Sequence, residues 1–148
     1  MRAPFEVIEH PADVGFLAYG KTLEELFAHA ALALVSLACE PAGIEEREPR
    51  AIEATGADLE ALLFAWLAEI LATADAEKMV FRRVEVTELR LPAPSEASAP
   101  GHARGRAWGE RFDRERHRAG TYLKAVTYHQ LRVEQIPGGW RAQVYVDV

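Results

Sequence analysis

The sequence predicts a single-domain α+β protein in which two helices pack on a mixed or antiparallel β-sheet. Two segments of the first half carry apolar residues at helical spacing, and short strand candidates lie before and between them. Four further strand candidates then follow one another without an intervening helix. A separate run of strands is typical of α+β folds, and 148 residues suffice for one core, so we expect one domain over residues 1–148.

The chain is expected to begin with two short strands joined by a turn. Residues 5–9 and 14–20 are rich in strand-forming side chains. Between them stands His10-Pro11-Ala12-Asp13, where the proline removes a hydrogen-bond donor and restricts the residue before it. We therefore predict a turn at residues 10–13.

Two helices are predicted from capping residues followed by apolar periodicity. Thr22 and Glu25 form a capping box that begins the first helix, and Pro41 ends it. A weak strand at 50–55 precedes the second helix, which Asp58 caps. Each helix has one broad apolar face, so we expect both to pack on the sheet. The apolar positions are Leu23, Leu26, Phe27, Ala30, Ala31, Leu34 and Leu37, then Leu59, Leu62, Leu63, Trp66, Leu67, Ile70 and Leu71.

The second half is predicted to be a run of strands. Residues 79–91 alternate sufficiently for a long strand, and residues 104–112 form another. The Pro-, Ala- and Ser-rich segment 92–101 between them is expected to be a solvated loop joining neighbouring strands of one sheet. A highly charged loop at 113–118 follows.

The last 26 residues predict a β-hairpin. Residues 124–134 and 140–148 are the two strands, and Pro137-Gly138-Gly139 supplies the turn. The sequence closes on Asp147-Val148, so acidic charge is concentrated at an end that is built into the sheet.

Bulk composition narrows the function classes. The net charge of −6 disfavours tight direct binding of nucleic acid and suits a cation or a basic partner surface. Cys39 is the only cysteine, which excludes an intrachain disulfide and a cysteine-based zinc site and fits a cytoplasmic protein. The sequence has no apolar run long enough for a membrane span and no secretion signal at its start.

Three groups of residues could carry chemistry. His10 and Asp13 can face one point across their turn as metal ligands, or they can be a solvated residue and a turn-forming aspartate. Asp147 and the carboxylate of Val148 could offer oxygens to a cation, or form a charged frayed end. The third group could be an acid–base pair or anion site, or a self-neutralising loop, because its six arginines at 104–118 are interleaved with acids. The residues of that group are Asp113, Arg116, His117, Lys124 and His129. The common signatures of nucleotide pockets and activated nucleophiles are absent from the sequence.

Over nearly its whole length, the chain resembles the archease family. The resemblance covers His10-Pro-Ala-Asp13-Val-Gly15, Gly20-Lys-Thr-Leu-Glu-Glu-Leu-Phe27, Asp58-Leu-Glu-Ala-Leu-Leu63 with Trp66-Leu67, Gly109-Glu110, Asp113, Arg116-His117, Lys124-Ala-Val-Thr-Tyr-His129 and Asp147-Val148. The family commonly has threonine where Pro11 stands, so the hydrogen bond of that hydroxyl is absent here.

The resemblance implies an accessory protein rather than an enzyme. Archeases are chaperone-like activators of the RtcB-type RNA ligase, which joins RNA ends in tRNA splicing and RNA repair through a guanylylated histidine and Mn²⁺. They promote guanylylation and multiple turnover. The family's metal site corresponds to Asp13 and Asp147, with Val148 and His10 as further candidates, and Lys124 matches the lysine implicated in activation. An oxygen-rich site favours Ca²⁺, Mg²⁺ or Mn²⁺ over Zn²⁺.

Two other functions remain open from the residues alone. One is a small metal-dependent hydrolase in which Asp13 and Asp147 hold the metal and His117 or His129 acts as the general base. The other is an RNA-binding module that uses the arginines at 104–118.

Overall fold

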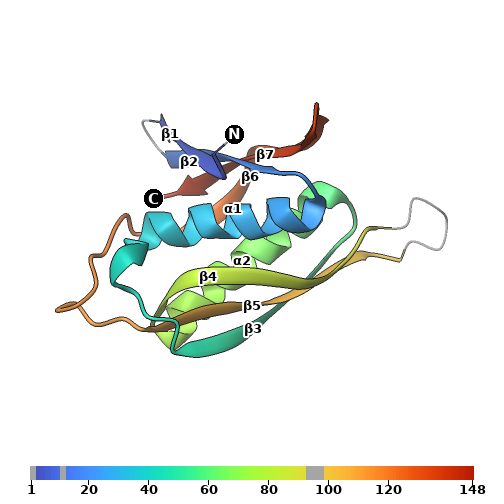
Figure 1. The fold of residues 1–148 in the computed structure, drawn as a ribbon. Helices are drawn as coiled ribbons and strands as arrows, with labels where there is room; N and C mark the ends of the chain where they lie inside the picture. Colours follow the sequence, from blue (N-terminus) through green and yellow to red (C-terminus); the bar gives the residue numbers. More distant parts are fainter. Residues whose placement is uncertain (1–2, 11–12, 93–98) are drawn as a thin grey trace.

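A computed structural model describes residues 3–10, 13–92 and 99–148, and it contains two antiparallel β-sheets with two α-helices between them (Figure 1). One sheet has the strand order β1-β2-β7-β6 and the other has the order β3-β5-β4. All neighbouring strands pair antiparallel. The α+β fold class is therefore confirmed, with the strands divided between two sheets where the sequence analysis expected one. The bounds are β1 Phe5–His10, β2 Asp13–Gly20, α1 Leu23–Ala38, a 3₁₀ turn at Pro41–Gly43, β3 Glu48–Gly56, α2 Leu59–Glu77, β4 Met79–Arg90, β5 Gly101–Arg111, β6 Ala125–Ile136 and β7 Gly139–Asp147.

The two helices form the middle layer and contact both sheets. Helix α1 packs on β2 above and β4 below, while α2 packs on β3 and β6. The core is centred on fully buried aromatic rings, among them Phe16, Phe27, Trp66 and Phe81. The indole Nε1 of Trp66 donates a hydrogen bond to the main-chain oxygen of Phe27 at 3.2 Å, which ties α2 to α1. A helix in this position must be apolar on two sides, and this requirement explains why the helices lack a wide polar face.

Both predicted helix starts are confirmed. The Thr22 hydroxyl accepts a hydrogen bond from the amide of Glu25, and the Glu25 carboxylate accepts one from the amide of Lys21. The Asp58 carboxylate accepts from the amide of Ala61 at 2.8 Å. These bonds satisfy amides at the helix ends that would otherwise lack partners.

The C-terminal hairpin is confirmed, with an irregularity in its first strand. Strand β6 ends at Ile136 and β7 begins at Gly139, and Gly138 has a φ of +83° that favours glycine in the turn. The register of β6 against β7 shifts between Thr127 and Arg132, and Gln130 adopts a φ of +53° there. This part of β6 is therefore a bulge and not the continuous strand expected over 124–134.

The segment 92–101 joins neighbouring strands, as predicted, because β4 and β5 are adjacent in the three-stranded sheet. Residues 93–98 lie outside the described part of the chain. Strand β5 begins at Gly101, three residues earlier than expected. Within the ranges described, no helix is long and apolar enough to cross a membrane.

Candidate functional site

The pairing of β2 with β7 places Asp13 directly opposite Asp147. They form the last register pair of these two antiparallel strands, and Asp147 is also paired with Ala125 of β6. Directly paired residues of antiparallel strands have Cα atoms about 4.5–5.5 Å apart and side chains on the same face. Two carboxylates that are 134 positions apart in the sequence are thus brought to one end of the four-stranded sheet.

Lys124 lies at the same end. Its amide donates a hydrogen bond to the main-chain oxygen of Asp147 at 2.8 Å, immediately before β6 begins. Lys124 is exposed, as are Asp147 and Val148, while Asp13 is half-buried. We call Asp13, Asp147 and Lys124 the acidic corner. The main chain of His10 is paired with that of Asp13, but the His10 side chain, Pro11 and Ala12 lie outside what the structure describes.

The donor set of the acidic corner fits a hard divalent cation. Like charges directly opposite each other on a sheet face are destabilising, and a bound cation would offset that repulsion between Asp13 and Asp147. Carboxylate oxygens are ligands that Ca²⁺, Mg²⁺ and Mn²⁺ prefer. Among the residues described, no three or more His, Cys, Asp or Glu side chains lie close enough to hold a metal. Main-chain oxygens, water or a partner's groups would have to complete the coordination.

Tyr145 lies on the same face of β7 as Asp147, two residues before it. Tyr145 is paired with Gly15, and a Cβ atom on Gly15 would stand 2.6 Å from the tyrosine ring. The glycine therefore allows the ring to lie across the strand, where Tyr145 is only 8% exposed. Alternation in residues 140–148 places Tyr145 on the same face as Arg141, Gln143 and Asp147, so its burial is not expected from the sequence. The pairing of this aromatic residue with a glycine explains the burial.

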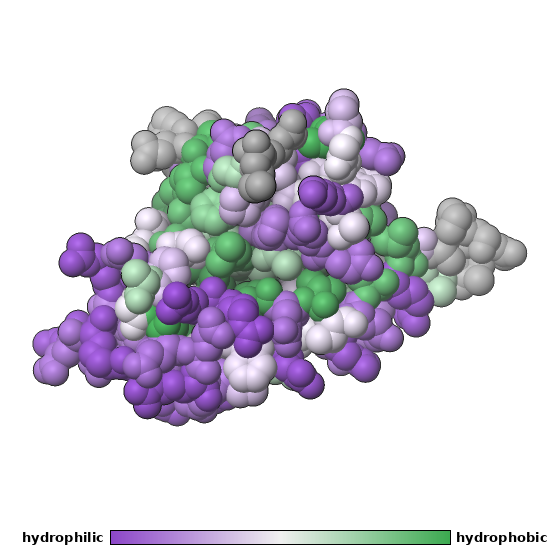
Figure 2. Space-filling view, viewed as in Figure 1, coloured by the Kyte–Doolittle hydropathy of each residue, from purple (hydrophilic) through white to green (hydrophobic). Residues whose placement is uncertain are grey.

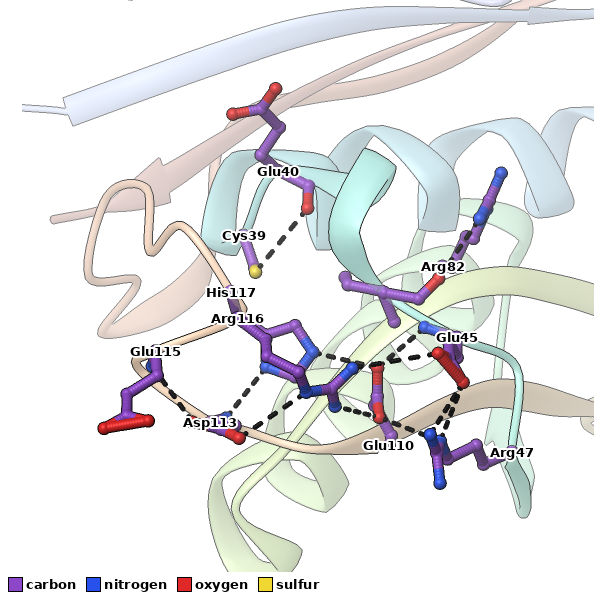
Figure 3. Close-up of polar contacts among 11 residues, drawn as sticks. Cys39, Glu40, Glu45, Arg47, Arg82, Glu110, Asp113, Glu115, Arg116 and His117 are labelled. Carbon is purple, nitrogen blue, oxygen red and sulfur yellow. Dashed lines mark hydrogen bonds and ion pairs between the residues drawn. The ribbon is translucent and has the colours of Figure 1, made fainter.

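Asp113, Arg116 and His117 gather around a different residue, the buried Glu110 of β5 (Figure 3). We call these four residues the Glu110 cluster. The Glu110 carboxylate accepts hydrogen bonds from the amide of Glu45 at 2.7 Å, from the Arg116 guanidinium and from Nε2 of His117 at 2.9 Å. Asp113, Arg116 and His117 were expected from the sequence to group with Lys124 and His129. In the structure Lys124 contacts Asp147 instead. His129 lies against Tyr145 instead, with ring centroids 6.0 Å apart.

The hydrogen bonds of His117 define its role. The amide of Asp113 donates to Nδ1 at 2.8 Å, so Nδ1 carries no proton in this arrangement. Nε2 must then carry the proton that it donates to Glu110. Because both ring nitrogens are occupied and the residue is buried, His117 is a structural histidine here and not a poised general base.

The neighbours of Glu110 in the cluster lower the pKa of its carboxyl group. Burial raises the pKa of this carboxyl, but the amide of Glu45 and the side chains of Arg116 and His117 together lower its pKa to about 2. Glu110 therefore remains ionised and keeps its three hydrogen bonds. These bonds indicate that the cluster stabilises the fold.

Two arginines of β5 are paired with acids on the outer face of the three-stranded sheet. Arg104 contacts Glu53 at 2.9 Å, and Arg106 lies 3.9 Å from Glu85. The guanidinium of Arg83 lies over the Trp108 ring at 4.8 Å. Hydrophilic residues cover the lower part of the molecule in Figure 2, where this sheet lies in Figure 1. These ion pairs neutralise Arg104 and Arg106, and such pairing disfavours a phosphate-binding surface on this face of the sheet.

A pocket of about 410 Å³ lies at the opposite end of the four-stranded sheet from the acidic corner. Its lining includes Tyr19, His29 and Trp140 but neither of the paired aspartates. The geometry thus separates this concave feature from the candidate metal ligands.

Comparisons with known proteins agree with this fold. A model of the archease protein family matches residues 5–148. The chain is 40% identical to protein archease of Methanosarcina mazei over 144 residues, covering 97% of this chain and 95% of the relative. It is 38% identical to protein archease of Pyrococcus abyssi over 146 residues, covering 97% of this chain and 98% of the relative.

Two solved structures are similar to this one. The solution structure of a Methanobacterium thermoautotrophicum protein has a TM-score of 0.82 at 34% identity, covering 98% of this chain and 99% of that one. The crystal structure of an archease from Thermotoga maritima, described as a possible chaperone, has a TM-score of 0.56 at 22% identity, covering 100% and 98%, and shows the fold alone. On the family match and the identity to curated archeases, this chain belongs to the archease family.

Proposed function

We propose that this protein is a metal-binding accessory protein that activates an RtcB-type RNA ligase. It would promote guanylylation and multiple turnover of that ligase in tRNA splicing or RNA repair. The observation that carries the proposal is the register pair of Asp13 and Asp147, with the amide of Lys124 bonded to Asp147, in a member of the archease family.

The acidic corner supports this role by its exposure and its charge. Asp147 and Lys124 are exposed at the end of the sheet, so a partner can reach them. When bound, a Ca²⁺, Mg²⁺ or Mn²⁺ ion would supply positive charge between the carboxylates. Asp13 and Asp147 would hold it, with main-chain oxygens of Val148 and the side chain of His10 as further candidates. The corner would enter the active-site cleft of the ligase and help to place metal or nucleotide for guanylylation.

The competing hydrolase is less well supported. Its candidate base His117 is buried with both nitrogens hydrogen-bonded, in a cluster built on the other sheet. His129 is exposed beside Tyr145 and remains available in that scheme. An assay of the isolated protein with Mn²⁺ and a phosphoester substrate distinguishes the two functions, because an activator has no phosphoesterase activity of its own.

The direct test is multiple-turnover ligation by the cognate ligase with each variant added. Asp13→Ala, Asp147→Ala and Lys124→Ala are expected to abolish stimulation while circular dichroism shows an intact fold. Asp75→Asn is the matched control, because it removes one exposed carboxylate from α2, away from the corner. Full stimulation by both corner aspartate variants would rule the proposal out.

A further inference from the structure

The connection between β5 and β6, residues 112–124, carries the chain from one sheet to the other (Figure 1). Its last residue is Lys124, whose placement beside Asp147 is central to the proposed function. After the hydrogen bond from the amide of Phe112 to the main-chain oxygen of Lys78, two anchors fix the connection to the rest of the protein before it reaches that lysine.

The first anchor is the Glu110 cluster. It holds Asp113, Arg116 and His117 against β5 through the Glu110 carboxylate (Figure 3). Arg116 and His117 also donate main-chain hydrogen bonds to the oxygen of Asp113. This anchor ends seven positions before Lys124, so it fixes the beginning of the connection and not its end.

The second anchor is the C-terminal end of α1. The amide of Gly120 donates to the oxygen of Ala38 at 2.9 Å, and the amide of Thr121 donates to the oxygen of Leu37 at 2.9 Å. These two oxygens belong to the last turn of the helix and have no partner within it. The connection therefore serves as a main-chain cap for α1.

Glycine is required for this close approach. A Cβ atom at position 120 would stand 2.3 Å from the main-chain oxygen of Leu37, which is too close for any side chain to be tolerated without a backbone shift. Leu37 is in a helix inside the middle layer, so the connection is the part that must move.

Little chain separates this anchor from the acidic corner. Of the three residues between Gly120 and Lys124, Thr121 is bonded to the helix and Leu123 is only 3% exposed. Lys124 itself is bonded to Asp147. Of these three described residues, Tyr122 alone is neither bonded to the helix nor buried, at 71% exposed, so we expect a displacement at Gly120 to reach Lys124.

We propose that Gly120, docked against the last turn of α1, is a positioning residue for Lys124. The inference rests on the proposed function for the role of Lys124, but the geometry that it claims can be tested without the ligase.

The ligase test is a double-mutant cycle in the multiple-turnover assay. Gly120→Ala is expected to reduce maximal stimulation by roughly 10-fold or more, because misplacement by about 1 Å is enough for losses of that size. In the Lys124→Arg background, which keeps the positive charge and is expected to retain part of the stimulation, Gly120→Ala should cause a clearly smaller further loss than in wild type, since both changes act through one side chain. Arg118→Ala is the matched control, because that side chain is 85% exposed and makes only a 3.6 Å surface ion pair with Glu40, while the main-chain hydrogen bond from the amide of Glu40 to the oxygen of residue 118 is kept. An equal further loss in both backgrounds would overturn the inference.

The ligase-free test is amide hydrogen exchange. In the wild-type protein, the amides of Gly120, Thr121 and Lys124 should exchange through one common opening, and in Gly120→Ala the Lys124 amide should exchange at least 10-fold faster. The amide of Leu62, bonded to Asp58 in the first turn of α2, should be unchanged. Should Gly120→Ala not fold, the wild-type measurement alone decides: protection of Lys124 that is independent of Gly120 and Thr121 overturns the positioning role. A wild-type protein that does not stimulate the ligase would instead overturn the proposed function.

Discussion

The acidic corner and the Glu110 cluster are both built from charged side chains, and they differ in burial and charge balance. In the Glu110 cluster a carboxylate that is 3% exposed receives hydrogen bonds from an arginine, a histidine and a main-chain amide. In the acidic corner two carboxylates face each other on the sheet, and one of them is exposed. The first arrangement is complete without a ligand, while the second places two like charges opposite each other, where a cation would offset their repulsion.

This contrast separates a structural charge cluster from one that we propose binds a metal ion. Buried ion pairs with all their hydrogen bonds made are costly to break but leave nothing for a partner to bind. A repulsive pair kept at an exposed sheet end costs stability, which suggests that it is retained for binding. Both groups are part of the resemblance to archeases, so resemblance alone does not distinguish their roles.

The largest expected effect is on stability and comes from the Glu110 cluster. Glu110→Ala removes the carboxylate that accepts hydrogen bonds from both Arg116 and His117. The guanidinium and the ring then lose this shared acceptor. The free energy of unfolding should fall by about 2–3 kcal/mol, because the amide of Glu45 and the ring of His117 lose a buried acceptor while Arg116, 41% exposed, stays partly solvated. Urea denaturation measures the loss. A loss below about 1 kcal/mol would show that the cluster is not the stabilising network that its geometry indicates.

The pH dependence of stability should be traceable to the same carboxyl. The pKa of Glu110 is about 2 in the folded protein and near 4.5 when unfolded, so the stabilisation is complete above pH 4.5 and is lost as the pH falls towards 2. At most about 3 kcal/mol is involved. Urea denaturation from pH 6 to pH 3 should show a shallower decline for Glu110→Gln than for wild type. Parallel curves would assign the acid sensitivity to other groups.

The smallest expected effect is in the acidic corner, and it has the opposite sign. In a chelating buffer, Asp13→Asn removes the repulsion with Asp147 and should raise the free energy of unfolding by roughly 0.2–1 kcal/mol. Asp75→Asn, on the exposed side of α2, should leave it within about 0.5 kcal/mol of wild type. Destabilisation by Asp13→Asn without metal would mean that this carboxylate is structural, as Glu110 is.

Much of the fold was readable from the sequence because its signals are local. The caps at Thr22 and Asp58 and the turn at Gly138 are short-range patterns, and the elements they predict are present. The second sheet was not readable, because the inner face of β5 is made of small residues and not of large apolar ones. There, Gly105 admits the ring of Trp66, whose Cη2 would be 2.9 Å from a Cβ atom at that position.

The candidate site depended on contacts between distant parts of the sequence. That Asp13 and Asp147 could meet was an expectation from the family resemblance, and no local pattern fixes the pairing of β2 with β7. The burial of Glu110 was not predicted either, because a Gly-Glu pair at the end of a charged strand has the composition of a surface. Only the fold brings the amide of Glu45 and the ring of His117 to that carboxylate.

The most direct test of the acidic corner is calorimetric titration of the isolated protein with Mn²⁺. The wild-type protein and the Asp75→Asn control should bind one ion with equal affinity. Asp13→Asn and Asp147→Asn should each weaken binding at least 10-fold, because each removes one of the two carboxylates that face each other across β2 and β7. Binding of unchanged affinity in both of these variants would contradict the assignment of the metal site to this pair.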